Sequence, residues 1–220
     1  MALTIVKFGG AALARETLSL ERFVPPGSGA CVVHGAGPRI SAAMQAAGIE
    51  PEFVGGRRVT SPETLAIVRE ALRSANQELC RQIGPRAAGV MGDDLGLLAD
   101  PLPRLGHVGV LRPFAPPALW RLLASDAVPV IAPLAVGPLN VNADDAAAAL
   151  AVALRADRLI FVSDVPGVLV DGEVVGTLSV REISDLLGEL GGGILPKLEA
   201  AARAAAAGVR AEVGATLVVA

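Results

Sequence analysis

The segment LTIVKFGGAAL, residues 3–13, decides the fold class. Its first six residues are apolar or β-branched apart from Lys7, which is the pattern of a strand buried on both faces of a parallel sheet. The glycine pair that follows indicates a tight turn where the strand ends. Lys7 therefore lies at the end of a buried strand, and it is one of only two lysines among 19 basic residues.

Similar apolar runs recur along the chain and predict further strands at 31–35, 87–92, 128–132, 158–164 and 216–220. Segments with helical patterns separate most of these runs, at 61–82, 116–125, 143–156, 179–190 and 196–207. This alternation implies right-handed crossovers and a mainly parallel sheet with helices on both faces, which is an α/β fold. Asp171-Gly172 between two apolar runs predicts an antiparallel hairpin. No linker or repeat marks a second domain, so we expect residues 1–220 to form one.

Composition narrows the function classes. The net charge of −3, with acidic and basic residues interspersed, provides no basic stripe for nucleic acid. Cys31 and Cys80 have no metal-ligand spacing and are expected to be reduced thiols. The most apolar segment, 146–170, is interrupted by charged residues, so neither a membrane span nor a leader is predicted. We therefore expect a soluble cytoplasmic protein that binds small ligands.

Two glycine-rich turns, KFGG at 7–10 and HGAG at 34–37, follow predicted parallel strands. The carboxyl ends of such strands bind ligands in α/β folds, and glycine lets backbone N–H groups approach an anion closely. Either turn alone is also compatible with an ordinary strand-to-helix connection. The GxxxxGK[ST] and complete GxGxxG fingerprints are absent, so a phosphate site would be of another kind.

The second lysine, Lys197, follows Pro196 at the start of the predicted helix 196–207. A cation there faces the positive end of the helix dipole, which costs up to about 1 kcal/mol unless an anion lies between them. Polyphosphate would supply that anion. The alternative is a solvated lysine, but a chain that otherwise uses arginine has little general need of lysine. Because a compact ammonium can follow a moving phosphoryl group better than a planar guanidinium, Lys7 and Lys197 are candidate phosphate-binding residues.

The segment LNVNADDAAAAL, residues 139–150, adds amides and carboxylates. Asn140 and Asn142 alternate on one face of an extended stretch, and Asp144 and Asp145 fall in the first turn of a helix that begins at about residue 143. Capping of this helix explains Asn142 and one aspartate but leaves Asn140 without a structural role. Asn140 is therefore a candidate binding residue.

Adjacent arginines occur in GGRRVT, residues 55–60. Neighbouring side chains on a strand point to opposite faces, so one of Arg57 and Arg58 is predicted to bind a carboxylate while the other meets solvent. The two histidines, His34 and His107, are interpreted as structural residues at a strand end and in a loop.

Seven motifs, in the same order over nearly the whole chain, resemble those of the amino-acid kinase family, and in particular of its acetylglutamate kinases: KFGG, VVHGAGP, GRRVTSPETL, LGHVGV, LNVNAD, ADRLIFVSDVPGVL and GGGILPK. The resemblance implies a three-layer αβα sandwich. It also implies transfer of the γ-phosphoryl of ATP, bound with Mg²⁺, to the side-chain carboxylate of N-acetyl-L-glutamate in arginine biosynthesis. A lobe of about 1–150 would hold the acidic substrate and the dimer contacts, and a lobe of about 151–220 the nucleotide.

The resemblance assigns roles by position. Lys7 and Lys197 would contact the transferring phosphoryl and the leaving oxygen, and Asp144 would orient both ammonium groups. The substrate would contact Ala36, Gly37, Arg58 and Asn140, with Arg58 on its α-carboxylate and Asn140 on its acetylamino end. Phosphate and nucleotide would contact Gly9, Gly10, Asp164, Val165, Pro166, Gly167, Val168 and Leu169. The resemblance implies no protein ligand to a metal.

Ala36 stands where the family usually has glycine, and a left-handed backbone there would cost about 1 kcal/mol.

Two other functions remain open: a kinase for a related blocked acidic amino acid, such as carrier-linked aminoadipate or glutamate, and a catalytically silent binder that regulates a partner. We also expect a homodimer that arginine does not inhibit, because the first strand begins near Met1 without the extra helix of arginine-sensitive, hexameric family members.

Overall fold

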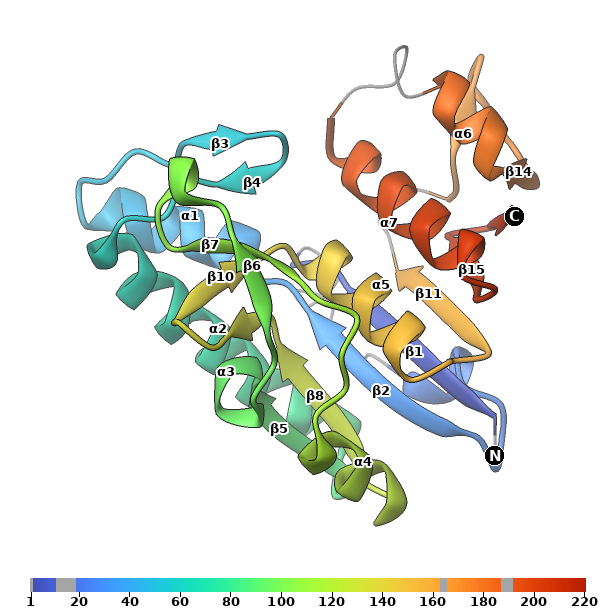
Figure 1. Ribbon diagram of the computed structural model, residues 1–220, viewed down its shortest axis with the longest axis horizontal. Helices are drawn as coiled ribbons and strands as arrows, with labels where there is room; N and C mark the ends of the chain where they lie inside the picture. Colours follow the sequence, from blue (N-terminus) through green and yellow to red (C-terminus); the bar gives the residue numbers. More distant parts are fainter. Residues whose placement is uncertain (1, 11–18, 163–165, 187–191) are drawn as a thin grey trace.

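A computed structural model describes residues 2–10, 19–162, 166–186 and 192–220 of the 220-residue chain. Its centre is an eight-stranded sheet in the order β14-β16-β15-β11-β1-β2-β8-β5 (Figure 1). Neighbouring strands run parallel except β15 and β16, which are antiparallel. The strands are β1 Leu3–Phe8, β2 Gly29–His34, β5 Ala87–Met91, β8 Val128–Ala132, β11 Arg158–Val162, β14 Thr177–Ser179, β15 Arg210–Val213 and β16 Thr216–Val219.

Helices cover both faces of this sheet. Ile5 of β1 belongs to a buried apolar cluster that includes residues of four of the longer helices, while its neighbour Val6 points the other way and belongs to a cluster with residues of two others. The first four are α4 Pro117–Ala124, α5 Ala143–Ala153, α6 Val180–Leu186 and α7 Leu195–Ala206, and the other two are α1 Gly37–Ala46 and α2 Pro62–Ile83. The predicted αβα sandwich is therefore confirmed.

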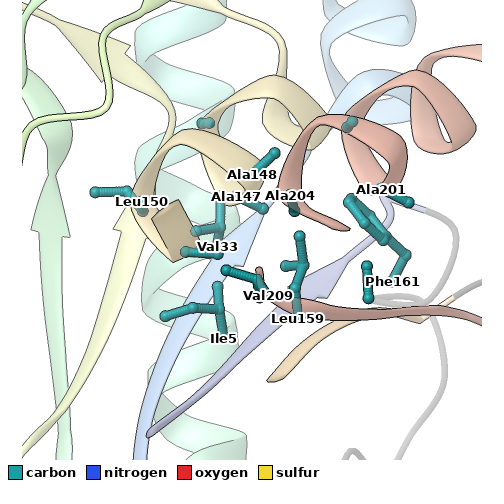
Figure 2. Close-up of a cluster of buried hydrophobic side chains, with 14 of the residues drawn as sticks. Ile5, Val33, Ala147, Ala148, Leu150, Leu159, Phe161, Ala201, Ala204 and Val209 are labelled. Carbon is teal, nitrogen blue, oxygen red and sulfur yellow. The ribbon is translucent and has the colours of Figure 1, made fainter. Parts of the chain in front are cut away.

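Alanine dominates the contact between α5 and α7. Ala147 and Ala148 of α5 and Ala201 and Ala204 of α7 are all buried, and Figure 2 shows them above the large side chains of the sheet, such as Phe161. Small side chains at a helix contact let the two helices approach closely. This packing holds the N-terminal turns of α5 and α7 at fixed positions relative to the sheet, and those turns carry Asp144 and Lys197.

Smaller elements complete the chain. A four-stranded sheet contains β6 Ala99–Pro101, β7 Val108–Leu111, β10 Leu139–Val141 and β9 Leu134–Ala135, in that order. Short helices are α3 Gly92–Leu95, η2 Leu20–Arg22, η3 Pro103–Leu105 and η4 Gly192–Ile194. Two hairpins are β3 Phe53–Val54 with β4 Arg57–Arg58, and β12 Leu169–Val170 with β13 Glu173–Val174. The second confirms the predicted turn, in which Asp171 and Gly172 both have positive φ.

Local side-chain and backbone features mark the ends of several helices. The Ser61 side chain accepts a hydrogen bond from the Thr64 backbone N–H at 3.1 Å and caps α2. Ser179 and Glu182 form the reciprocal capping box at the start of α6. Gly208 has a positive φ and lies two residues after the last residue of α7, where this backbone conformation commonly ends a helix. The predicted helix 179–190 is described only as far as residue 186, and residues 187–190 lie outside the described part.

Candidate active site

The two glycine turns meet at the carboxyl edge of the central sheet. β1 and β2 are parallel with Phe8 opposite His34, so the KFGG and HGAG segments leave the sheet side by side. A Cβ on Gly10 would lie only 2.6 Å from the ring of Pro38, which only glycine avoids. A Cβ on Gly9 would lie 4.0 Å from Lys7 Nζ and would occupy the space beside that ammonium. The glycine pair thus leaves room next to the lysine.

Asp144 stands between the two lysines. Its Oδ1 is 2.7 Å from Lys7 Nζ, and its Oδ2 is 3.8 Å from Lys197 Nζ. Asn142 fixes this carboxylate, because its side-chain oxygen accepts the backbone N–H bonds of Asp144 and Asp145 and caps α5. The predicted capping role of Asn142 is confirmed, and lysines 190 residues apart in sequence are brought to one carboxylate.

The two lysines differ in how tightly they are held. The Lys7 side chain on β1 is 5% exposed, between the neighbouring strands β2 and β11. The Lys197 side chain is 18% exposed, and its Nζ donates to the Gly193 carbonyl at 3.0 Å. The ammonium of Lys7 is therefore anchored by a buried ion pair, while that of Lys197 has a looser contact with Asp144.

A cavity of about 350 Å³ opens at this edge of the sheet. This volume lies in the range of small-molecule sites. Nine of the predicted site residues line it: Lys7, Gly9, Gly10, Ala36, Gly37, Arg58, Asn140, Asp144 and Lys197. The structure thus brings the predicted catalytic and substrate residues together around one space.

Arg58 enters the cavity from β4 as a buried cation. Its guanidinium donates to Ser41 Oγ at 2.9 Å and to the Gly37 carbonyl at 3.3 Å, and it lies 4.5 Å above the Phe53 ring. Within the described part of the chain, no carboxylate forms an ion pair with it. Burial lowers the pKa of Arg58 from its ordinary value. A buried guanidinium held by neutral acceptors has an unmet preference for an anion.

Arg57, in contrast, does not meet solvent as predicted. Its Nη2 donates to Asp145 Oδ2 at 2.5 Å, and its side chain is 24% exposed. The alternation of a strand did place the two arginines on different sides, but the side opposite to Arg58 holds a buried carboxylate. The prediction failed because the sequence pattern of a two-residue strand does not reveal which helix lies behind it.

Ala36 and Asn140 are both placed without strain. Ala36 has φ −140°, so the left-handed backbone considered for this position is not adopted and costs nothing here. Asn140 donates from Nδ2 to Thr60 Oγ1 at 3.1 Å, and Thr60 in turn donates to the Arg58 carbonyl at 2.8 Å. The Asn140 amide is therefore linked through Thr60 to the backbone of Arg58.

The described part of the predicted nucleotide turn, residues 166–169, is not among the residues that line this cavity. Asp164 and Val165 fall outside the described residues. Pro166 accepts a hydrogen bond from the Ala215 backbone, and the Val168 N–H donates to Thr216 Oγ1 at 2.8 Å. These contacts fasten the segment 166–169 to the turn between β15 and β16, and none of its four residues lines the cavity.

His34 and the cysteines have structural surroundings. His34 is fully buried, and its Nε2 lies 3.1 Å from Asn76 Nδ2 of α2. Burial lowers the pKa of His34 to about 4, and the nearby positive charge of Arg39 contributes less. Cys31 and Cys80 are free thiols, as expected, and burial raises the pKa of Cys31 to about 12. None of these side chains lines the cavity.

Sequence reasoning missed three contributors to this site. Phe53 lies against Arg58, Asp145 pairs with Arg57, and Arg203 of α7 also donates to Asp145. The only signal in the sequence was the pair of aspartates in NADD. One acidic side chain in the first turn is explained by the helix dipole, and the second, Asp145, is left without an explanation. Arg203 lies outside every quoted motif, six residues after Lys197 in the same helix, and carries no signal of its own.

Comparison with known proteins now gives the family. The model of the amino acid kinase family matches residues 2–214. The chain belongs to the amino acid kinase family. Relatives include the acetylglutamate kinase of Pseudothermotoga lettingae, 38% identical over 94% of this chain and 81% of that protein, and the acetylglutamate kinase of Rubrobacter xylanophilus, 41% identical over 97% and 88%. A solved structure of smu.665 from Streptococcus mutans is 29% identical, with a TM-score of 0.87 over 99% of this chain and 98% of that one.

The family match covers the site as well as the fold. The matched region contains every residue that lines the cavity and every strand of the central sheet except β16, so the amino acid kinase likeness includes the site and not only the fold. In the part of the chain that the structure describes, no helix combines the length and apolar character needed to cross a membrane.

Proposed function

We propose that this amino acid kinase transfers the γ-phosphoryl of MgATP to the side-chain carboxylate of N-acetyl-L-glutamate. The relatives that match over most of the chain carry the name acetylglutamate kinase. The observation that carries the proposal is Asp144 in contact with both Lys7 and Lys197 at the edge of the cavity. A protein that only bound a ligand would have no need of two ammonium groups converging on one carboxylate.

Positioning and charge stabilisation suffice for this reaction. A substrate carboxylate is already ionised at neutral pH, so no general base is required to activate it. One of its oxygens forms the new bond to the γ-phosphorus, the bond to the bridging oxygen breaks, and ADP leaves with that electron pair. Negative charge moves toward the leaving oxygen, where Lys197 would stabilise it, while Lys7 would hold the transferring group. The backbone N–H groups of Gly9 and Gly10 would donate to phosphate oxygens.

The acidic substrate would bind on the other side of the cavity. Arg58 would hold its α-carboxylate, because this buried guanidinium has neutral partners among the described residues and a carboxylate accepts its fork of donors. Ala36 and Gly37 would form the wall beside it, and Asn140 would bind the acetylamino end. We also infer that residues 1–150 serve the acidic substrate and 151–220 the nucleotide, with the segment from Asp164 to Leu169 contacting the base or ribose.

The nucleotide would bring Mg²⁺ with it. The residues fit this arrangement, because the open space beside Gly9 and the two ammonium groups suit phosphate oxygens. Within the described part of the chain, no cluster of three acidic, histidine or cysteine side chains could hold a metal. Mg²⁺ commonly binds through substrate phosphates, and when bound it neutralises part of their charge.

Hydroxylamine trapping tests the proposal, because hydroxylamine converts an acyl phosphate into a measurable hydroxamate. We expect N-acetyl-L-glutamate with MgATP to give hydroxamate, and N-acetylaspartate, free glutamate and N-acetyl-aminoadipate to give far less. Strong activity with N-acetyl-aminoadipate would shift the substrate assignment, and no activity with any acceptor would contradict the proposal. Light scattering would test the homodimer that the family resemblance predicts.

A further inference from the structure

Asp145 follows the catalytic candidate Asp144 but makes separate contacts. Its side chain is 5% exposed, and each of its oxygens accepts a hydrogen bond from a different arginine. Arg57 Nη2 lies 2.5 Å from Oδ2, and Arg203 Nη2 donates to Oδ1. A buried carboxylate needs such partners, because it has lost its water. The residues Arg57, Asp145 and Arg203 are called the arginine latch below.

The arginine latch joins three elements that each carry a site residue. Arg57 belongs to the β3–β4 hairpin and is followed directly by Arg58, Asp145 belongs to α5, and Arg203 belongs to α7, the helix that begins beside Lys197. Asp144, Arg58 and Lys197 all line the cavity. The buried carboxylate of Asp145 therefore connects the hairpin that carries Arg58 to the helix that carries Lys197.

Two further contacts bring the hairpin against the same helices. A Cβ built on Gly56, which has φ +72°, would lie 2.8 Å from the ring of Pro196 at the start of α7. The Gly56 carbonyl also accepts from Asn142 Nδ2 at 3.4 Å. The hairpin tip thus rests on the N-terminal turns of α5 and α7, the same two helices that the arginine latch joins to the hairpin.

We propose that the arginine latch is a positioning device that couples the β3–β4 hairpin to α7, so that binding of the acidic substrate and binding of the nucleotide reinforce each other. This inference rests on the proposed function for the identity of the two ligands. When Arg58 holds a substrate carboxylate, the hairpin is held in place. Arg57 then keeps Asp145 in the position that Arg203 and α7 require, and Lys197 is kept in reach of the phosphates.

A purely structural ion-pair cluster would behave differently. Such a cluster would stabilise the fold, and its loss would lower the unfolding temperature. Its loss would not change how strongly one ligand affects the affinity for the other. Coupling between two sites is a separate quantity, the ratio of a ligand's dissociation constants without and with the other ligand. That ratio decides between the two readings.

The first experiment needs no ligand and measures hydrogen exchange in the full chain. In Asp145→Asn, amides of the hairpin 53–58 and of the first turn of α7 should exchange about threefold faster or more, because both arms of the arginine latch lose their charged acceptor. Arg203→Ala, at a position where the side chain is 50% exposed, should loosen the same two segments. Arg210→Ala is the matched control, since Arg210 is 61% exposed and pairs with Glu212 instead. Exchange equal to the control in both segments would overturn the inference.

The second experiment measures the coupling by calorimetry with AMP-PNP, Mg²⁺ and N-acetyl-L-glutamate. We expect the acidic ligand to tighten AMP-PNP binding about fivefold or more in the wild type and in Arg210→Ala, and to have almost no effect in Asp145→Asn and Arg203→Ala. An unchanged ratio in both latch variants would refute the coupling. If the wild-type protein binds neither ligand, the proposed function fails, while hydrogen exchange still tests whether the arginine latch joins the hairpin to α7.

Discussion

Replacing Lys197 by arginine tests the role of its ammonium most directly. In the structure, Nζ donates to the Gly193 carbonyl at 3.0 Å and lies 3.8 Å from Asp144 Oδ2, which is too far for a hydrogen bond. An ammonium has three donors, so most of its capacity remains for phosphate oxygens. A guanidinium is longer and forked, and it would form a two-pronged pair with Asp144 instead.

The size of the effect follows from that competing pair. A hydrogen bond between charged groups contributes about 1.5–3 kcal/mol, and the arginine would have to give up such a bond to reach the leaving oxygen. It would also fit that oxygen poorly. Losing one preorganised contact with the transition state costs about 10²- to 10³-fold in kcat, or about 3–4 kcal/mol. We therefore expect Lys197→Arg to lower kcat by that factor, with smaller changes in both KM values because the contact strengthens as charge moves.

The assay is hydroxamate formation at saturating substrates, combined with the unfolding temperature. Because the Lys197 side chain is partly exposed, the variant should unfold within about 0.5 kcal/mol of the wild type. Arg210→Lys, an opposite exchange at an exposed position outside the cavity, should change neither quantity. Turnover of Lys197→Arg near the wild-type rate would remove this lysine from the mechanism.

Lys7→Arg should lose both activity and about 1–3 kcal/mol of stability, because its site is buried and a guanidinium overpacks it.

Three further predictions follow from the contacts. Arg58→Ala should raise the KM for N-acetyl-L-glutamate about thirtyfold to a hundredfold and the KM for ATP by no more than about fivefold, the part that the proposed coupling contributes; an effect on ATP alone would contradict the substrate role. Burial lowers the pKa of His34 from 6.5 to about 4, so the unfolded state binds the proton more strongly and the wild type should lose up to about 3 kcal/mol of stability as pH falls through that range. His34→Gln should show a flatter pH dependence in urea unfolding, and parallel curves would refute this. Cys31 should react with a thiol reagent only on unfolding, and Cys80 earlier; early labelling of Cys31 would show that its burial is wrong.

The fold was predictable because its signals are local. Continuous apolar runs identify buried strands such as 3–8, and side-chain caps at Ser61 and Asn142 mark where helices begin. These signals depend on a few neighbouring residues and the backbone, so they survive in a single sequence. The parallel direction of β1 with its neighbours β2 and β11 agrees with the mainly parallel sheet that the strand-helix alternation predicts.

The site was predictable only in part, because its geometry depends on contacts between distant elements. Lys7 and Asp144 carried their own signals, a lysine in an apolar strand and an aspartate in a capped first turn. The partner of Arg57 could not be read from the sequence, because the face of a two-residue strand becomes buried or exposed according to which helix packs there. Arg203 could not be predicted for the same reason. An arginine in an alanine-rich helix is ordinarily interpreted as a solvent-exposed residue.

The unequal contacts of Asp144 also explain why the chain has lysine at both positions and arginine elsewhere. Lys7 is fixed on a strand with its ammonium 2.7 Å from the carboxylate, so its charge stays in one place. A guanidinium would not fit that buried space. Lys197 lies at the start of a helix, 3.8 Å from the other oxygen, and its flexible stem can follow an oxygen as charge develops on it. Under the proposed mechanism, limited space would favour lysine at position 7 and the need to follow the moving charge would favour lysine at position 197, whereas arginine would meet neither requirement.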